Sequence, residues 1–422
     1  MSLIHKTIFT GFSPNSTVRD VRLACAYLFF PWKWISWREG EYPAKVEERL
    51  QHYFNTSHAV TMDSGRSALL ASLQALGIQT GDEVLVQAYT CVVVINAILF
   101  AGGTPVYVDI GADFCMDPDD IKKKITPKTK ALIVQHTFGQ AADMDTIMTL
   151  AKEHTLAVVE DCAHSFGATY KGKLLGTFGD IAIVSFGSDK VVSSVRGGAV
   201  ITNSDLLAAK VREKVREFPL MNIHILLRHL LHYPFFFLGR AWYSFGLGKA
   251  LLAFAKRAQL INSIIEPSEK KSEQSLYFPA KFPNALARIA FLQIAEVDKV
   301  NAKRKQIARV YTLGLRGIDS IRLPPIDEEC IYLRYTIRTN DAGRIRHTLR
   351  RQGVYLGDWY DTVIAPKDID MSRTGYTPGS CPVAERIAQE SVNLPTGRHI
   401  TQKDVTFIID ALHACLALPS NK

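Results

Sequence analysis

The chain is poor in the features that mark disulfide-rich, zinc-binding and membrane-spanning proteins. Its 422 residues include only seven cysteines, which are scattered and never form a Cys-x-x-Cys pair. That pattern predicts a reduced, cytoplasmic chain with neither a disulfide framework nor a zinc site. No apolar run reaches the roughly 18–20 residues that a membrane-spanning helix needs, and no secretory signal is expected. No pair of histidines has the spacing typical of metal ligands, so no metal is predicted.

Acidic residues are missing from one long segment. Phe218–Ile265 contains no Asp or Glu, although it carries Arg and Lys among Leu, Phe, Tyr and Trp. Leu23–Trp37 is similarly rich in aromatic residues, with a single Lys. Such stretches are typical of a helical insertion packed on the core or on a partner subunit, and they also suit helices lying in a membrane interface. The sequence leaves both alternatives open.

The net charge of +9 invites a nucleic-acid interpretation. Part of the excess lies in the acid-free segment, and part lies in Lys299–Arg309 and Arg344–Arg351. The last two stretches are typical of solvated helix faces. Nucleic acid is therefore not expected as a partner.

From about residue 57, short β-rich apolar runs alternate with helical stretches. This alternation predicts a mainly parallel sheet with helices on both faces. The predicted strands are Ala59–Met62, Glu83–Gln87, Pro105–Val108, Ala131–Gln135, Ala157–Glu160 and Ile181–Phe186. Further along, the pattern predicts one long helix over Ala285–Tyr311, a strand over Tyr332–Arg338 and a final helix over Gln402–Leu416. In such sheets the site lies beyond the carboxyl ends of the strands, so polar residues there are the first candidates.

The strongest group of candidates follows two of these strands. Asp161 ends one run, Ser185 ends the next, and Lys190 follows five residues later. A pyridine-ring cofactor bound as a Schiff base needs an amine, a buried carboxylate beside the ring nitrogen, and small donors for its phosphate. Each residue alone has an ordinary explanation, such as a helix cap or a solvated lysine. Together, at consecutive strand ends, they predict such a site.

An ordered series of motifs resembles the DegT/DnrJ/EryC1/StrS family of pyridoxal-phosphate-dependent sugar aminotransferases. The resemblance covers roughly residues 40–210 and 277–415, and it is carried by Gly81-Asp-Glu-Val, Gly102–Asp109, His136–Asp145, Glu160-Asp-Cys-Ala-His164, Gly167–Lys173, Ser185-Phe, Lys190 and Gly197-Gly198. It implies a fold type I α/β protein with a large, mainly parallel-sheet domain and a smaller C-terminal α+β domain. We expect a large domain over 1–213, a basic and hydrophobic helical insertion over 214–276, and the small domain over 277–422. The resemblance also implies a homodimer.

The resemblance assigns a role to each candidate residue. Lys190 forms the Schiff base and moves protons, Asp161 pairs with the ring nitrogen, His164 lies over or beside the ring, and Ser185 binds the phosphate or the phenolic oxygen. Ser64-Gly65-Arg66-Ser67 opens a helix whose N-terminus meets the phosphate. Relatives that act as sugar dehydratases carry His in place of this lysine, so Lys190 favours transamination.

Several positions depart from the family pattern. Cys91 stands where the family usually places an aromatic ring over the cofactor, and Tyr89 is the nearest substitute. Arg66 replaces a phosphate-binding Thr, and Arg196 stands where Glu is frequent. The Asn-Tyr-Arg motif that reaches the partner subunit's phosphate is Pro279-Ala-Lys281 here, so Lys281 keeps only the charge.

The resemblance implies transfer of an amino group from L-glutamate, through pyridoxal 5′-phosphate (PLP), to a keto sugar that is nucleotide-linked. The product would serve surface-polysaccharide or natural-product biosynthesis. Two alternatives accompany this expectation. One is an enzyme at the inner membrane face that contacts the membrane through residues 218–265 and uses a lipid-linked substrate. The other, suggested by the departures, is a non-catalytic scaffold with a regulatory role.

Overall fold

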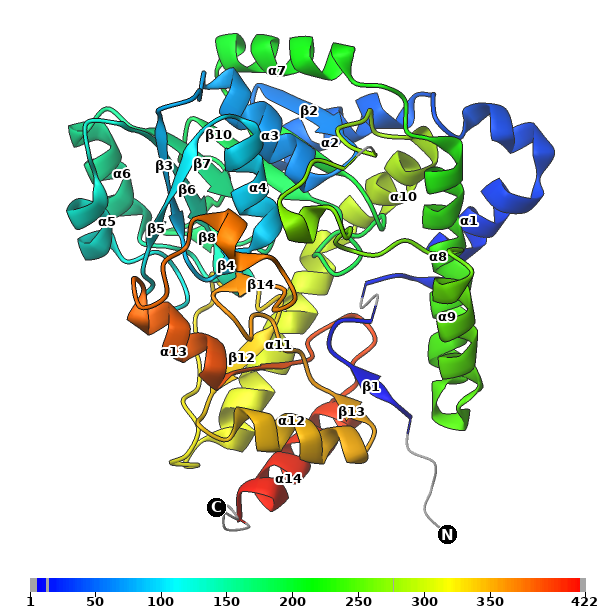
Figure 1. Ribbon diagram of the computed structural model, residues 1–422. Helices are drawn as coiled ribbons and strands as arrows, with labels where there is room; N and C mark the ends of the chain where they lie inside the picture. Colours follow the sequence, from blue (N-terminus) through cyan, green and yellow to red (C-terminus); the bar gives the residue numbers. More distant parts are fainter. Residues whose placement is uncertain (1–5, 13–14, 276, 418–422) are drawn as a thin grey trace.

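A seven-stranded sheet forms the centre of the computed structural model, which describes the chain except for residues 1–5, 13–14, 276 and 418–422 (Figure 1). Its order is β2-β11-β10-β7-β6-β3-β5. The strands are β2 (His58–Met62), β3 (Glu83–Gln87), β5 (Thr104–Val108), β6 (Thr129–Gln135), β7 (Ala157–Asp161), β10 (Ile181–Ser185) and β11 (Gly198–Thr202). Only β11 runs antiparallel to its neighbours, so the sheet is mixed but mainly parallel, as predicted.

Helices cover both faces of this sheet because the side chains along each strand point alternately to its two faces and both faces are apolar. On β6, Leu132 and Val134 join one buried cluster while Ala131 and Ile133 join the other. The first cluster packs under α2 (Tyr42–Phe54), α5 (Pro118–Lys124), α6 (Met144–Glu153) and α10 (Asn284–Ile294). The second packs under α3 (Gly65–Ala75), α4 (Val92–Phe100) and α7 (Asp205–Glu217). The α/β fold class is thereby confirmed.

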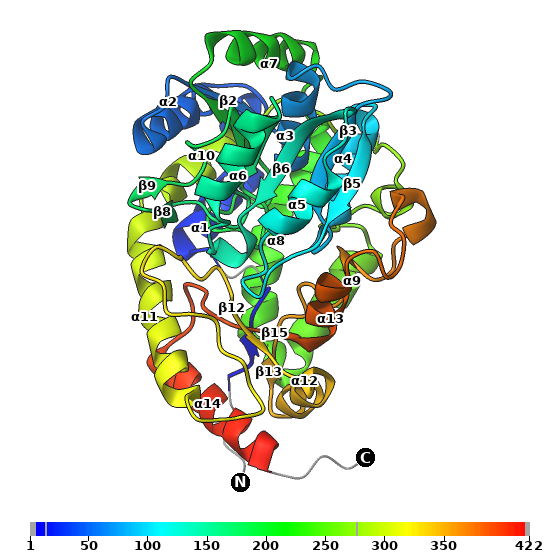
Figure 2. The ribbon, with the colours of Figure 1, turned by 90° about the vertical axis from the view of Figure 1, so that its left-hand side faces the viewer.

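The C-terminal part has a hydrophobic cluster of its own. The elements of the C-terminal part are α11 (Val297–Leu315), β12 (Tyr335–Arg338), α12 (Ala342–Arg351), β13 (Val354–Tyr355), α13 (Pro382–Glu390), β15 (Ser391–Leu394) and α14 (Gln402–Ala417). In Figures 1 and 2, α12 and α14 lie below the main sheet. The short strand β1 (Ile8–Phe9) pairs with β13, and β14 (Ile364–Ala365) pairs with β4 (Thr90–Cys91). Both ends of the described chain therefore contribute to this part.

The acid-free segment folds as two helices, α8 (Ile223–Ala241) and α9 (Leu247–Arg257), of which α8 packs against α1 (Val18–Phe29). Asn222 caps α8 by accepting a hydrogen bond from the His224 N–H. The two helices meet at glycines: a Cβ on Gly239 would lie 2.6 Å from Leu252 Cδ1, and one on Gly248 would lie 2.0 Å from the Gly239 oxygen. The absence of a side chain at Gly239 and Gly248 lets the two helices approach each other this closely.

The prediction of a single helix over Ala285–Tyr311 is wrong. The structure has two helices there, α10 and α11, separated at Ala295–Glu296. Glu296 has a φ of −113°, outside the helical range, so the axis changes direction at this residue. The apolar periodicity continues across the break, which is why the sequence pattern did not show it. The predicted strand over Tyr332–Arg338 is shorter, beginning at Tyr335.

Among the described residues, no helix is long and apolar enough to cross a membrane. All seven cysteines are free thiols, and five of them are buried.

Candidate active site

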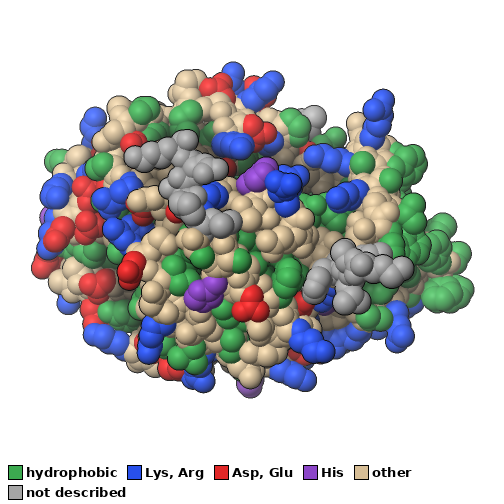
Figure 3. Space-filling view, turned by 90° about the horizontal axis from the view of Figure 1, so that it is seen from below, with side chains coloured by type: hydrophobic (Ala, Val, Ile, Leu, Met, Phe, Trp, Pro, Cys, Tyr) green, Lys and Arg blue, Asp and Glu red, His purple; other side chains and the backbone are tan. Residues whose placement is uncertain are grey.

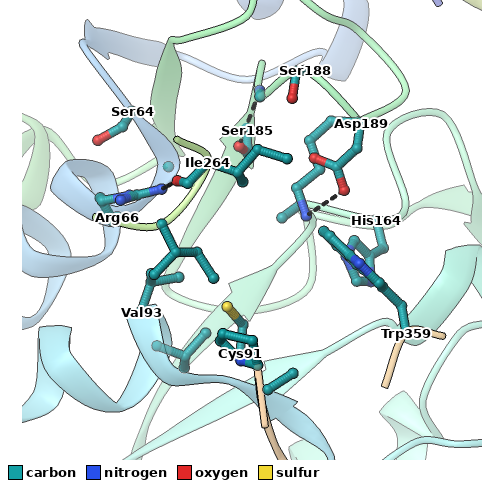
Figure 4. Close-up of a pocket in the computed structure, with 18 of the residues that line it drawn as sticks. Ser64, Arg66, Cys91, Val93, His164, Ser185, Ser188, Asp189, Ile264 and Trp359 are labelled. Atoms are coloured by element: carbon teal, nitrogen blue, oxygen red, sulfur yellow. Dashed lines mark hydrogen bonds and ion pairs between the residues drawn. The ribbon is translucent and has the colours of Figure 1, made fainter. Parts of the chain in front are cut away.

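A cavity of about 450 Å³ lies beyond the carboxyl ends of β7 and β10 (Figure 4). Four parts of the chain line it: the start of α3, the strand ends with the loop after β10, the α8 side of the insertion, and a C-terminal loop. Residues from these four parts include Ser64, Gly65, Arg66, Asp161, His164, Ser185, Lys190, Arg196, His229, His232, Asn262, Ile264, Trp359 and Tyr360. The cavity therefore lies beyond the carboxyl ends of the parallel strands, where the sequence analysis expects the site.

Asp161 and Lys190 both reach this cavity. Asp161 is the last residue of β7 and is 4% exposed, with one carboxylate oxygen accepting the Ala163 N–H at 3.0 Å. Burial raises the pKa of the Asp161 carboxyl, while the Ala163 N–H and the charge of Lys190 act against that rise. The Lys190 ammonium lies 4.0 Å from Asp189 and 5.2 Å from the ring centre of Trp359. A buried carboxylate and a lysine amine therefore face one cavity.

Residues that sequence reasoning did not single out position Lys190. Asp189 is buried and pairs with Arg334 at 3.5 Å as well as with Lys190. The side-chain amide of Asn15 donates to the Lys190 carbonyl oxygen, and Arg304 donates to Asn15 at 2.9 Å. Both arginines are buried in the interior. The loop that carries Lys190 is thus tied to the N-terminal segment and to the C-terminal part.

The start of α3 forms a cradle against β10. Ser64 caps the helix, its hydroxyl accepting the Ser67 N–H at 3.2 Å. A Cβ on Gly65 would lie 2.8 Å from the Ser185 Cβ, so only glycine allows this approach. The first helical turn of α3 and the Ser185 hydroxyl lie together at the positive end of the helix dipole. This arrangement suits a phosphate.

His164 lines the same cavity and packs among other aromatic rings. Its Nδ1 accepts the Phe138 N–H at 3.4 Å, and its ring stacks on Phe138 with centres 5.8 Å apart. Trp359 and Tyr360 are 6.3 Å and 6.2 Å away. Burial lowers the pKa of His164 well below its usual value, and the charges of Lys190 and Arg334 add to this. His164 is therefore a neutral ring at neutral pH.

Arg66 and Arg196 line the cavity, but each is already paired. Arg66 forms an ion pair with the buried Glu269 and donates to the Ile264 carbonyl at 2.9 Å. Arg196 pairs with the buried Asp63 at 3.3 Å. The residues that partner Arg66 belong to the segment that follows α9. The insertion thereby closes one wall of the cavity from within the same chain.

Three of the predicted cofactor residues do not line the cavity: Ser67, Tyr89 and Lys281. Ser67 donates to Asp63 at 2.6 Å, behind the cradle. The Tyr89 hydroxyl donates to Ser391 and accepts the Tyr360 N–H, and burial raises its pKa to about 12. The geometry of the single chain does not support a stacking role for Tyr89, because its ring is enclosed by Phe114, Phe138 and Tyr360. Their assignment to the cofactor stays a prediction.

The aromatic surface of the cavity comes instead from Trp359 and Tyr360. They lie in Gly357-Asp-Trp-Tyr-Asp361, where no regular strand or helix pattern marks a site. His229, His232 and residues 262–265 were also missed as lining residues. For Trp359 and Tyr360, the available sequence signal was two adjacent aromatic residues flanked by acidic residues in an irregular stretch. No sequence signal marked His229, His232 or residues 262–265.

A buried cluster of His136, Glu160 and Cys162 has side chains of metal-ligand type. Glu160 accepts N–H groups from Gly176, Phe178 and Gly179, and it pairs with His136 at 3.2 Å. Burial opposes ionisation, but these hydrogen bonds and His136 still lower the pKa of Glu160. These contacts make the cluster a structural tie between β7 and the loop before β10.

The family model of the DegT/DnrJ/EryC1/StrS aminotransferases matches residues 32–227 and 253–413. The chain belongs to this family. The unmatched residues between these stretches, 228–252, fall in α8 and the start of α9.

Relatives agree with this assignment. GDP-perosamine synthase of Escherichia coli O157:H7 is 28% identical over 381 residues, covering 90% of this chain and 91% of the relative. The crystal structure of Streptomyces venezuelae DesV in complex with a ketimine intermediate matches with a TM-score of 0.73 at 26% identity, covering 95% of each chain. NtdA from Bacillus subtilis with bound cofactor PMP matches with a TM-score of 0.74 at 23% identity, over 95% of this chain and 83% of that one.

The protein is thus a member of a PLP-dependent sugar aminotransferase family, and PLP is the cofactor of that family. The residues of the cavity fit PLP. The Gly65 cradle leaves room where a side chain would clash, and the α3 N-terminus offers donors to an anion. Asp161 offers a buried carboxylate and Lys190 an amine in the same space.

Proposed function

We propose that this protein transfers an amino group from L-glutamate to a nucleotide-linked keto sugar. The observation that carries the proposal is the convergence of Asp161, Lys190 and the Gly65–Ser185 cradle on one cavity. A nucleotide-linked substrate is supported by relatives such as GDP-perosamine synthase, whose name contains a sugar nucleotide. Its phosphates would suit a chain with a net charge of +9.

In this proposal PLP, when bound, supplies an electron-withdrawing ring that stabilises negative charge at the substrate carbon next to nitrogen. Asp161 holds a proton on the ring nitrogen, because its carboxylate sits in a site from which water is largely excluded. Lys190 binds the cofactor through its Nζ and then takes and returns the proton at the reacting carbon. His164, neutral and stacked, packs beside the ring.

The remaining contacts hold the phosphate. Ser64, Gly65 and Ser185 offer N–H and hydroxyl donors, and Arg66 adds charge from the wall of the cavity. Lys281 fits the proposal only across a homodimer, where it would reach the partner subunit's phosphate. The three-part division at residues 213 and 276, and a cytoplasmic reaction serving surface-polysaccharide or natural-product synthesis, belong to the same proposal.

The test is the visible absorption of the purified protein before and after addition of L-glutamate. We expect a cofactor band that glutamate bleaches, and we expect Lys190→Ala to lack the native band. Lys173→Ala, which removes an exposed lysine of the same part of the chain, is the matched control and keeps the band. A protein that remains colourless after added PLP would contradict the proposal and favour the regulatory scaffold.

The acceptor is tested separately by supplying pyridoxamine phosphate and a set of nucleotide-linked keto sugars. We expect amination of at least one of them, detected as the amino sugar nucleotide by mass spectrometry. A band that responds to glutamate without amination of any nucleotide-linked sugar would retain the transaminase and reject this substrate class.

A further inference from the structure

Large apolar side chains lie exposed on the side of the molecule formed by α1 and α9. They belong to the end of α1, to the 3-10 helix η1 (Pro31–Ser36), and to α9 with the turn before it. We call this set the apolar surface: Phe29, Phe30, Trp32, Trp34, Ile35, Trp242, Phe245, Leu247 and Phe254. Trp32 is 70% exposed and Ile35 is 91% exposed, and no residue of η1 is buried. Large apolar side chains that lie exposed in a group, as on η1, mark an interaction site.

Figure 3 shows hydrophobic side chains gathered at the right-hand edge of the molecule, the side on which Figure 1 places α1 and α9. Exposed hydrophobic side chains thus gather at the side of the molecule to which both helices belong.

The fold holds these side chains outward. The buried Trp37 donates to the Tyr27 carbonyl at 2.9 Å, and Trp34 donates to the Leu28 carbonyl at 3.3 Å. These bonds join Trp34, inside η1, and Trp37, directly after it, to α1, so this part of η1 is fixed on that helix. α9 is fixed on α8 by the close approach of Leu252 to Gly239. Its Leu247 and Phe254, seven residues apart, share the face that points away.

α9 also carries positive charge: Lys249 and Lys256, seven residues apart, lie on the side of this helix opposite to Leu247 and Phe254. Lys249, Lys256 and Arg257 are exposed, and the surrounding segment Phe218–Ile265 contains no acidic residue. In a two-fold contact between copies, the same patch meets itself, so like charges would approach one another. An anionic lipid surface offers the opposite charge. Tryptophan is also the side chain that best suits the boundary between headgroups and acyl chains, since its ring is apolar and its N–H is polar.

We propose that the apolar surface docks this protein on the surface of an anionic membrane. Trp32, Trp34 and Ile35 enter the headgroup region, and Lys249, Lys256 and Arg257 face the anionic headgroups. This inference does not depend on the proposed amino transfer. It does place the cavity near the membrane, because α8 contributes His229 and His232 to the cavity and also packs against α9.

The experiment is vesicle flotation of the full chain. We compare vesicles of phosphatidylcholine with vesicles that also contain phosphatidylglycerol, at low and high salt. We expect flotation with the anionic vesicles and its loss at high salt, because salt screens the attraction. The double variant Trp32→Ser/Ile35→Ser should lower the vesicle partition coefficient by about tenfold or more, since two large apolar side chains lose their burial in lipid.

The matched control is Leu206→Ser/Leu313→Ser, which removes two exposed leucines, 65% and 67% exposed, that lie outside the apolar surface. It should float like the original protein. Lys256→Glu/Arg257→Glu should abolish the difference between the two lipid compositions. Circular dichroism of all variants verifies that they fold.

Two outcomes would overturn the proposal. One is equal flotation of the Trp32/Ile35 variant and the leucine control, or no flotation at all. The other is an oligomer in light scattering that the Trp32/Ile35 variant converts to monomer without any vesicle binding. That second result would assign the apolar surface to a contact between copies of this chain.

Discussion

The two walls of the cavity differ in how they are held. One wall is built from strand ends and a helix start, where Asp161, Ser185 and Gly65 occupy positions set by the sheet. The other wall comes from the insertion, where His229 and residues 262–265 reach the cavity and are joined to it by the Arg66–Glu269 pair. The sheet wall carries the groups to which we assign the reaction chemistry. The insertion wall encloses them.

This difference has a consequence for mutations. A change on the sheet wall should reduce activity or cofactor binding while leaving most of the fold intact. A change on the insertion wall should reduce stability first, because it breaks contacts between segments far apart in the sequence. The following variants separate these two responses.

Glu269→Gln should cause the largest loss of stability. It keeps the size of the side chain but leaves the charge of Arg66 without its partner, at a site where Glu269 is 1% exposed. We expect the free energy of unfolding to fall by about 3–5 kcal/mol in urea titrations. Glu328→Gln, which breaks an exposed pair with Arg309, is the control and should cost less than about 1 kcal/mol. Equal losses for both variants would show that the insertion is not tied down through Arg66.

Asp161→Asn should reduce amino transfer by about 10²–10³-fold, because the amide cannot hold a proton on the ring nitrogen as a carboxylate does. Its unfolding free energy should stay close to that of the original protein, since burial already opposes the charged form of Asp161. The rate is measured with glutamate and the accepted keto sugar. Asp410→Asn, an exposed change on α14, is the control. A normal rate in Asp161→Asn would remove this carboxylate from the mechanism.

Gly65→Ala tests the cradle. Its Cβ would lie 2.8 Å from that of Ser185, so α3 and β10 must move apart. We expect a loss of about 1–3 kcal/mol in unfolding free energy, together with weaker PLP binding in equilibrium titrations. Gly343→Ala, on α12 with no atom within 4 Å of the new Cβ, should instead stabilise by up to about 1 kcal/mol. Unchanged PLP affinity in Gly65→Ala would mean that the phosphate lies elsewhere.

The smallest effect concerns pH and the insertion wall. Burial lowers the pKa of His232 from 6.5 to about 3. Below the unfolded pKa the unfolded chain binds a proton that the folded chain does not, so stability falls as the pH decreases from about 6.5 toward 3. For one such group the slope is at most about 1.4 kcal/mol per pH unit.

The measurement is urea unfolding between about pH 7 and pH 5. His232→Phe keeps a ring stacked on Phe236, whose centre lies 3.8 Å away, and should lose less stability over this interval than the original protein. The exposed His224→Phe is the control and should keep the original dependence. Identical slopes for all three proteins would exclude His232 as a contributor.

Much of the sheet wall could be predicted from sequence because its signals are local. Alternating apolar runs indicate strands, and polar residues directly after them, such as Asp161 and Ser185, must lie at one edge of a parallel sheet. Ser64 before Gly65 indicates a helix start for a similar reason. Tyr89 shows the limit of this reasoning: it follows β3 in the expected place, yet its ring points into the core, toward Tyr360.

The sequence of this protein determined its α/β class, its family and the residues at the strand ends, because short-range periodicity and ordered motifs encode these features. Only the tertiary structure decided that Trp359 and Tyr360 supply the aromatic side of the cavity and that Glu269 holds Arg66. It also decided that Trp32 and Ile35 remain outside the core. Each of these outcomes depends on contacts between segments separated by up to hundreds of residues, and no local pattern specifies which of those segments will meet.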